Sequence, residues 1–171
     1  MPNKGFTLIE LVFVIALLGL LAAVAAPKFI NISRDARIEA INQLKVSVKS
    51  ANDLLFVKSK VPSYVFEKTE CQPRCTDIDI DQNGVIEIDQ SPDSTTPDVR
   101  LIWSYLDNAD VTKRITMSGD FVEERDDPAD VYLGYDLNGD GDVQDDLCSF
   151  KYTQVSAEGG APIYELITDG C

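Results

Sequence analysis

An uninterrupted apolar run from Leu11 to Ala26 constrains this chain more than any other feature. No side chain in the run is charged or polar, and Glu10 is the only ionisable residue between Lys4 and Lys28. Counted from position 6 to position 30, the stretch approaches the roughly 20 residues that a helix needs to cross about 30 Å of hydrocarbon. The run therefore predicts a membrane helix near the start of the chain.

A secretory signal peptide also has a short charged region before an apolar core. Here no small-residue cleavage pattern follows the core, which runs through Pro27 into a helical pattern, so we expect the segment to be kept. A proline inside a helix usually kinks it, and a kink is expected near Pro27. Beyond it, apolar residues at three- and four-residue spacing predict an amphipathic helix: Ile38, Ile41, Leu44, Val48, Ala51 and Leu55.

A helix from Phe6 to about Lys58 would be about 80 Å long, at 1.5 Å per residue. That length exceeds what a small domain can bury. We therefore expect the first part of the helix to serve in the membrane and in assembly, and the part after about Ile38 to pack on a domain core. Pro62 is expected to end the helix.

Near its start the chain contains the motif Lys4-Gly5-Phe6-Thr7-Leu8-Ile9-Glu10. Together with Pro27, this motif resembles the prepilin N-terminus of type IV pilins and of the pseudopilins of type II secretion. The resemblance implies that a prepilin peptidase cuts between Gly5 and Phe6 and methylates the new amino terminus, so that residues 1–5 are a leader. Around Pro27 the sequence Ala25-Ala26-Pro27-Lys28-Phe29-Ile30-Asn31 is most similar to mannose-sensitive haemagglutinin (MSHA) pilins.

Glu10 has a physical explanation that does not depend on the resemblance. A carboxylate within a membrane helix is costly, by about 2.5–3.5 kcal/mol on insertion scales, and is therefore functional by default. The free amine of a processed Phe6 on an adjacent subunit is its natural partner, because it has the opposite charge. The alternative is a carboxylate near the helix end that only reaches the membrane interface.

Charge is distributed unevenly along the chain. Residues 1–60 hold eight Lys and Arg against four Asp and Glu, whereas residues 61–171 hold seven against 25, a net charge of +4 against −18. So acidic a region should repel nucleic acids, whose binding depends on Lys and Arg at the phosphates. We expect divalent cations or cationic surfaces as partners instead, and no nucleic acid.

Four cysteines follow the apolar run and none precedes it, as expected for a domain that folds in an oxidising compartment. Four cysteines allow three pairings, and the sequence does not choose among them. The resemblance to type IV pilins suggests a Cys148–Cys171 disulfide, and Cys71 with Cys75 would close a small local loop. A Cys₄ zinc site is the alternative, which the oxidising setting disfavours.

The expected fold is α+β, with the long helix packed on an antiparallel sheet. Residues 1–5 form the leader, 6–30 the transmembrane and assembly half of the helix, 31–60 its amphipathic half and 61–171 an acidic globular head. Strands are expected over 114–117, 131–135, 149–155 and 163–168, with a hairpin loop over 158–162. Residues 99–106 fit a short helix after a proline, or equally a strand.

Two acidic segments have the spacing of a calcium loop, with oxygen ligands at alternating positions and a glycine at the sharp turn. In the C-terminal segment the expected ligands are Asp136, Asn138, Asp140 and Asp142, with Asp145 or Asp146 closing the shell because Leu147 replaces the usual Glu. In the earlier segment they are Asp79, Asp81 and Asn83, with Glu87 or Asp89 in place of Gln90. We expect Ca²⁺ at one or both; the alternatives are an acidic turn and a strand–turn–strand.

No nucleophile–base pair, phosphate-binding glycine loop or acid dyad is recognisable, and the chain has no His, so we expect neither an enzyme nor an organic cofactor. The leading hypothesis is an MSHA-like pilin, inserted in the inner membrane with a periplasmic head and then assembled into an extracellular adhesive filament. Its expected partners are copies of itself, related pilins, the prepilin peptidase and the inner-membrane assembly machinery. The alternatives are a pseudopilin of type II secretion and a calcium-dependent binding module tethered singly to the membrane.

Overall fold

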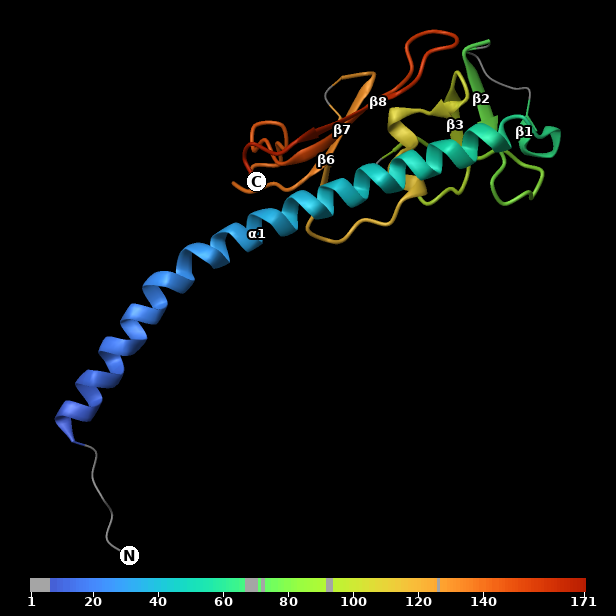
Figure 1. Ribbon diagram of the computed structural model, residues 1–171. Helices are drawn as coiled ribbons and strands as arrows, with labels where there is room; N and C mark the ends of the chain where they lie inside the picture. Colours follow the sequence, from blue (N-terminus) through green and yellow to red (C-terminus); the bar gives the residue numbers. More distant parts are fainter. Residues whose placement is uncertain (1–6, 67–70, 72, 92–93, 126) are drawn as a thin grey trace, which may run out of the picture. The chain divides into compact units, whose positions relative to one another are not determined.

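The computed structural model describes residues 7–66, 71, 73–91, 94–125 and 127–171 (Figure 1). The described chain begins with one long helix, α1, which spans Leu8–Lys58 and contains 51 residues. It divides into two compact units, Met1–Arg37 and Ile38–Cys171. The boundary lies inside α1, near the residue at which the amphipathic pattern begins.

In the first unit, α1 begins directly after Thr7, whose carbonyl oxygen accepts hydrogen bonds from the backbone N–H groups of Glu10 and Leu11. The backbone stays helical through Pro27, although proline lacks an N–H donor. The side chains of residues 26–31 lie outside the described part, and the expected kink stays a prediction.

In the second unit, one face of α1 is buried. Ile41, Leu44, Val48 and Leu55 are at most 5% exposed, and Ile38 and Ala51 are half-buried. Their spacing of three and four residues puts them on one side of the helix, which confirms the predicted amphipathic face. The helix ends at Lys58, and Pro62 begins a 3₁₀ helix, η1 (Pro62–Tyr64).

The first sheet has four antiparallel strands in sequence order: β1 (Val65–Phe66), β2 (Cys75–Ile78), β3 (Val99–Ile102) and β4 (Tyr105–Leu106). The helix considered for residues 99–106 is therefore wrong. Trp103 and Ser104 join β3 to β4 with positive φ angles of 51° and 77°, the pattern of a type I′ hairpin turn. Such turns usually contain Asn or Gly, so this sequence gave no turn signal.

The second sheet is also antiparallel and in sequence order: β5 (Val122–Glu124), β6 (Asp130–Gly134), β7 (Ser149–Thr153) and β8 (Ile163–Ile167). Its last three strands confirm the predictions, and the 158–162 segment lies in the turn between β7 and β8. The strand predicted over 114–117 is wrong, because Arg114 ends a 3₁₀ helix, η3 (Thr112–Arg114), and residues 115–117 belong to no strand. Another 3₁₀ helix, η2 (Asn108–Asp110), precedes η3. β5 was missed because it is short and half-exposed.

Both sheets contribute to one core with the buried face of α1. Figure 1 shows the sheets on the same side of the C-terminal half of the helix. Asn52 is fully buried in α1; its Oδ1 accepts a hydrogen bond from Leu106 N of β4 (2.7 Å), and its Nδ2 donates one to Tyr164 Oη of β8 (2.9 Å). Tyr152 Oη of β7 donates to Leu106 O (2.6 Å), so polar groups join the helix to both sheets.

Candidate functional site

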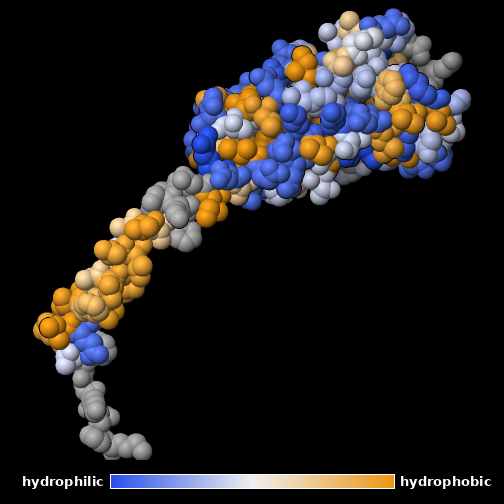
Figure 2. Space-filling model, viewed as in Figure 1, coloured by the Kyte–Doolittle hydropathy of each residue, from blue (hydrophilic) through white to orange (hydrophobic). Residues whose placement is uncertain are grey.

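The N-terminal segment of α1 presents apolar side chains that no other part of the described chain covers. Residues 7–24 are all exposed, and Figure 2 shows hydrophobic residues along this part of the helix. By length and composition, Leu8–Ala25 is able to cross a membrane. Continuous apolar surface of this kind marks a membrane or protein contact.

Glu10 lies in the first turn of α1, where a negative charge is favourable near the N-terminal end of a helix. Thr7 Oγ1 donates a long hydrogen bond, 3.5 Å, to Glu10 Oε2. Thr7 and Glu10 are three residues apart, which is the spacing of a capping box. The structure thus adds a local contact of Glu10 with Thr7 at the start of the helix, which the sequence reasoning did not weigh. Gly5 and Phe6 lie outside the described residues, so the cleavage site and the amine partner stay predictions.

The cysteines form two disulfides, Cys71–Cys75 and Cys148–Cys171. The first joins Cys71 to the first residue of β2. The second joins the start of β7 to the C-terminal residue of the chain, beyond β8. This is the pairing that the pilin resemblance suggested, and it excludes the Cys₄ zinc alternative because all four thiols are oxidised.

The C-terminal acidic loop folds around Asp136. Its Oδ1 accepts a hydrogen bond from Gly139 N (2.6 Å) and its Oδ2 one from Gly141 N (2.9 Å). Both glycines have positive φ, 84° and 90°, as the sharp turns require. Asn138 Oδ1 accepts from Asp140 N (2.9 Å), and Asp140 Oδ1 accepts from Asp142 N (2.9 Å). The expected ligand residues therefore follow one another in successive turns.

The closing residues of this loop are also near it. Asp146 Oδ2 accepts from Leu137 N (2.6 Å), and Asn138 Nδ2 donates to Asp145 Oδ2 (3.4 Å). The pKa of Asp145 is raised by desolvation and then by the negative charges of four neighbouring acids, Asp140, Asp142, Asp146 and Asp136. The structure thus brings these carboxylates together, on an exposed part of the head.

Glu124 of β5 is a residue of this loop that the sequence reasoning missed. Its Oε2 accepts from Val143 N (2.7 Å) and its Oε1 from Gln144 Nε2 (2.6 Å). Both of its oxygens are therefore occupied in holding the loop. Nothing local in the sequence pointed to it, because β5 itself was not predicted.

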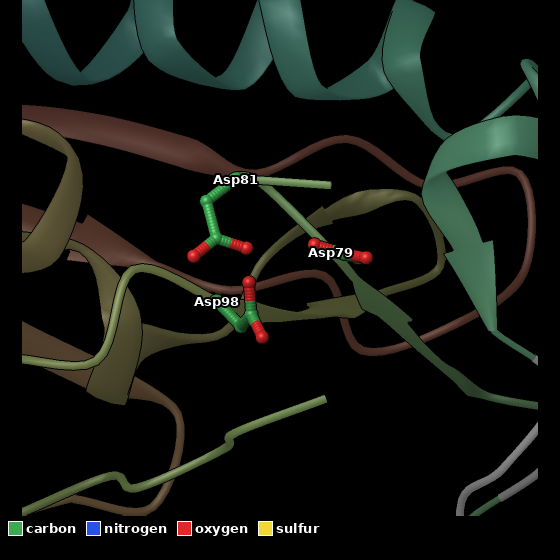
Figure 3. A group of neighbouring side chains, drawn as sticks. All are labelled: Asp79, Asp81 and Asp98. Atoms are coloured by element: carbon green, nitrogen blue, oxygen red, sulfur yellow. The ribbon is translucent and has the colours of Figure 1, made fainter. Parts of the chain in front are cut away.

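The earlier acidic segment is organised differently from the prediction. Asp79 and Asp81 lie together with Asp98, one carboxylate oxygen of each within 4.8 Å of the others (Figure 3). Asn83 Nδ2 donates to Asp81 Oδ2 (3.0 Å) and stays beside the group. Among the described residues, Glu87 and Asp89 are not in this group, and Asp89 Oδ1 accepts from Ser91 N (3.0 Å).

Asp98, which the sequence reasoning did not consider, reaches the group through strand pairing. Ile78 is the last residue of β2 and pairs with Val99, the first residue of β3. Because the two strands are antiparallel, Asp79 and Asp98 follow and precede this pair at the same end of the ladder. The position of Asp98 directly before β3 was the available sequence signal. It points to Asp79 only once the register between β2 and β3 is known.

A family model for the prokaryotic N-terminal methylation motif matches residues 1–26. The chain is similar to the type IV narrow pilus major component PilA5 of Thermus thermophilus, 38% identical over 60 residues that cover 35% of this chain and 52% of that protein. It is similar to the type IV major pilin protein PilA of Myxococcus xanthus, 38% identical over 66 residues, 38% of this chain and 30% of that protein.

A third relative, the fimbrial protein EcpB of Eikenella corrodens, is 32% identical over 85 residues, which cover 50% of this chain and 45% of that protein. The chain thus spans about half or less of the length of these curated relatives. No solved structure matches the chain significantly.

The motif and the exposed helix behind it define a class, proteins that combine the prokaryotic N-terminal methylation motif with an apolar N-terminal helix. Within that class, the chain is similar to type IV pilins over 60 to 66 of its residues. Its α+β architecture, a long N-terminal helix with antiparallel sheets, is pilin-like. Such a helix fits a membrane-anchored precursor and an extracellular pilus.

Proposed function

We propose that this chain is a structural subunit, not an enzyme, of a type IV pilus of the MSHA kind, used for surface attachment. Before assembly it would be held in the inner membrane with its head in the periplasm. The observation that supports this proposal most is the exposed apolar surface of α1 over residues 7–24, directly behind the methylation motif.

The assembly follows from the chemistry of that surface. Apolar surface removed from water contributes about 25 cal/mol per Å², so a helix leaving the membrane must be covered by something equally apolar. The same segments of neighbouring subunits, either copies of this chain or related pilins, provide such a cover. The prepilin peptidase and the inner-membrane assembly machinery are the further partners of this proposal.

Processing at Gly5 is the first step to test. Gly5→Arg introduces a large side chain at the cleavage position, and we expect the leader to stay attached and filaments to be lost. Gly119→Arg is the matched control, because nothing lies within 4 Å of a Cβ at Gly119. Mass spectrometry of the N-terminus and electron microscopy of the cells measure both effects. Normal cleavage of Gly5→Arg would contradict the processing step.

Two substitutions of Glu10 separate the role of its charge from a role of its side chain at the start of the helix. Gln keeps the capping-box pattern but removes the charge, whereas Leu removes both and improves membrane insertion. If Glu10 pairs with the Phe6 amine of a neighbour, Glu10→Gln and Glu10→Leu should both reduce filament yield strongly. A Gln variant that assembles like wild type would show that the carboxylate serves the helix end alone.

The alternatives differ in what cells lacking this chain lose. A pilus subunit predicts the loss of surface filaments and of attachment, with secretion of exoproteins intact. A pseudopilin of type II secretion predicts loss of exoprotein secretion, with surface filaments and attachment intact. A singly tethered, calcium-dependent binding module predicts no polymer and an uncut Gly5–Phe6 bond.

Calcium binding by the C-terminal loop is part of the proposal, with Asp136, Asn138, Asp140 and Asp142 as ligands and Asp145 or Asp146 closing the shell. It is supported by the gathering of these acids and by the two turn glycines. Calcium at tenfold over its Kd should stabilise the full chain in detergent micelles by about 1.4 kcal/mol. In a chain that also carries Asp79→Asn, which silences the earlier acidic segment, Asp136→Asn/Asp140→Asn should abolish this increment, and its persistence would leave the loop as an acidic turn.

A further inference from the structure

We propose that Asp79, Asp81 and Asp98 form a second calcium site, which ties the segment after β2 to the start of β3. Asp98 supplies the closing carboxylate that the segment itself lacks at Gln90. The three side chains point toward a common centre from two segments that are distant in sequence (Figure 3). This site belongs to the head, and the proposal does not depend on filament formation.

Burial is the first argument for a bound cation. Asp79 is 1% exposed and Asp98 is 0% exposed, and the Asp81 carboxylate lies beside them. Ionised carboxylates lose their hydration when buried and need a compensating charge or hydrogen bonds. Three of them within 4.8 Å also repel one another. A dication at their centre would relieve both costs.

Other buried acids of the head already have a cationic partner. Asp77, which is 3% exposed, contacts Arg100 at 2.8 Å, and Asp110, which is fully buried, contacts Lys113 at 2.9 Å. In the part of the chain that the structure describes, no ion pair includes Asp79, Asp81 or Asp98. Lys113 Nζ does approach Asp98, but it donates to the backbone carbonyl oxygen (3.3 Å). The three carboxylates therefore have no side-chain cation there.

The hydrogen bonds orient the carboxylates and leave one oxygen unused. Asp98 Oδ1 accepts from Ile80 N and its Oδ2 from Glu87 N, both at 2.9 Å. Asp79 Oδ2 accepts from Gly84 N at 2.9 Å. Asp79 Oδ1 is buried and has no hydrogen-bond partner among the described residues. A buried, unpartnered carboxylate oxygen needs an explanation, and a bound ion provides one.

The chemistry of the donors selects the ion. All three are carboxylates, the chain has no His, and its four cysteines are in disulfides, so soft or borderline metals find no preferred ligand. Ca²⁺ accepts six to eight oxygens in flexible geometry, whereas Mg²⁺ demands a near-ideal octahedron. The three carboxylates come from two separate segments, and that of Asp81 is exposed. Such an arrangement fits the flexible coordination of Ca²⁺ better than the strict octahedron of Mg²⁺. Calcium would then hold the long β2–β3 connection at its two ends.

The experiment uses the full chain in detergent micelles, in the Asp136→Asn/Asp140→Asn background that silences the C-terminal loop. Tenfold excess of CaCl₂ over Kd should raise the Tm by about 3–6 °C above that in chelator. MgCl₂ and NaCl of matched ionic strength should raise it much less. Asp79→Asn keeps an oxygen for Gly84 N but removes the charge, and it should abolish the calcium shift without lowering the Tm in chelator.

Asp89→Asn is the matched control, an exposed acid of the same segment outside the group, and it should keep the whole shift. Asp81→Asn changes an exposed position and keeps the test valid if the buried Asp79→Asn variant does not fold. Its calcium Kd, measured by calorimetry, should rise at least tenfold. No calcium shift in the background chain, a shift retained in Asp79→Asn, unchanged affinity in Asp81→Asn, or an equal shift with MgCl₂ would overturn the proposal.

Discussion

Asn52 provides the sharpest test of how the head is held together. It is fully buried in the apolar face of α1, yet both polar atoms of its side chain are used, one by β4 of the first sheet and one by β8 of the second. Replacing it with Leu keeps a side chain of similar size and fits the apolar pattern of the helix. By helical periodicity alone the change looks favourable, whereas the hydrogen bonds predict the opposite.

The magnitude follows from the groups that would lose their partners. Leu106 N–H would be left buried without an acceptor, which costs about 1–3 kcal/mol. Tyr164 is half-buried and its hydroxyl can bond to water instead, so loss of the hydrogen bond from Asn52 costs about 1 kcal/mol more. The extra apolar surface that Leu buries roughly offsets this second cost. We expect Asn52→Leu to lower the free energy of unfolding by about 1–3 kcal/mol and the Tm by about 2–12 °C.

The assay is thermal and urea unfolding of the full chain in detergent micelles, followed by the fluorescence of the single Trp103. Asp53→Leu, an exposed position next to Asn52 in α1, controls for a new apolar residue in the helix and should change the Tm little. Tyr164→Phe removes one hydrogen bond and should cost about 1 kcal/mol. If Asn52→Leu were as stable as wild type, the view that Asn52 joins the two sheets would be wrong.

Three further predictions concern the second sheet and the disulfides. The Cys148–Cys171 disulfide, with a sequence separation of 23, should contribute about 3 kcal/mol to the free energy of unfolding. The Cys71–Cys75 disulfide, with a separation of 4, should contribute about 2 kcal/mol. Urea midpoints of variants in which each cysteine pair is replaced by Ala measure both contributions. Gly134→Ala places its Cβ 2.5 Å from Cys148 O and Ser149 Cβ, so it should destabilise by about 1–3 kcal/mol in the same assay, and wild-type stability would contradict this register. Burial raises the pKa of Tyr164 from 10.0 to about 12, so the unfolded chain loses this proton first and stability should fall between pH 10 and 12. In a pH series of melting curves, the stability of Tyr164→Phe should fall less steeply than that of wild type. Equal slopes for the two chains would exclude Tyr164 as a cause.

Features that depend on near neighbours in the sequence were predictable. The buried face of α1 from Ile38 to Leu55 follows from a three- and four-residue spacing that one helix imposes on its side chains. Likewise β6, β7 and β8 are short apolar runs with turn residues between them, and the loop around Asp136 follows from alternating oxygens with glycines. In each case the residues that determine the structure are within about ten positions of one another.

Features that depend on pairing between distant segments were decided only by the tertiary structure. The long stretch between β2 and β3 hides their antiparallel pairing, so the sequence suggested Glu87 or Asp89 beside Asp79 and Asp81, whereas the register brings Asp98. In the same way, the structure has two sheets where the sequence suggested one, and it places the polar Asn52 in the core. The reason is physical: local propensity records the cost of a conformation for a few residues, whereas strand register is set by the total burial and hydrogen bonding of the whole head.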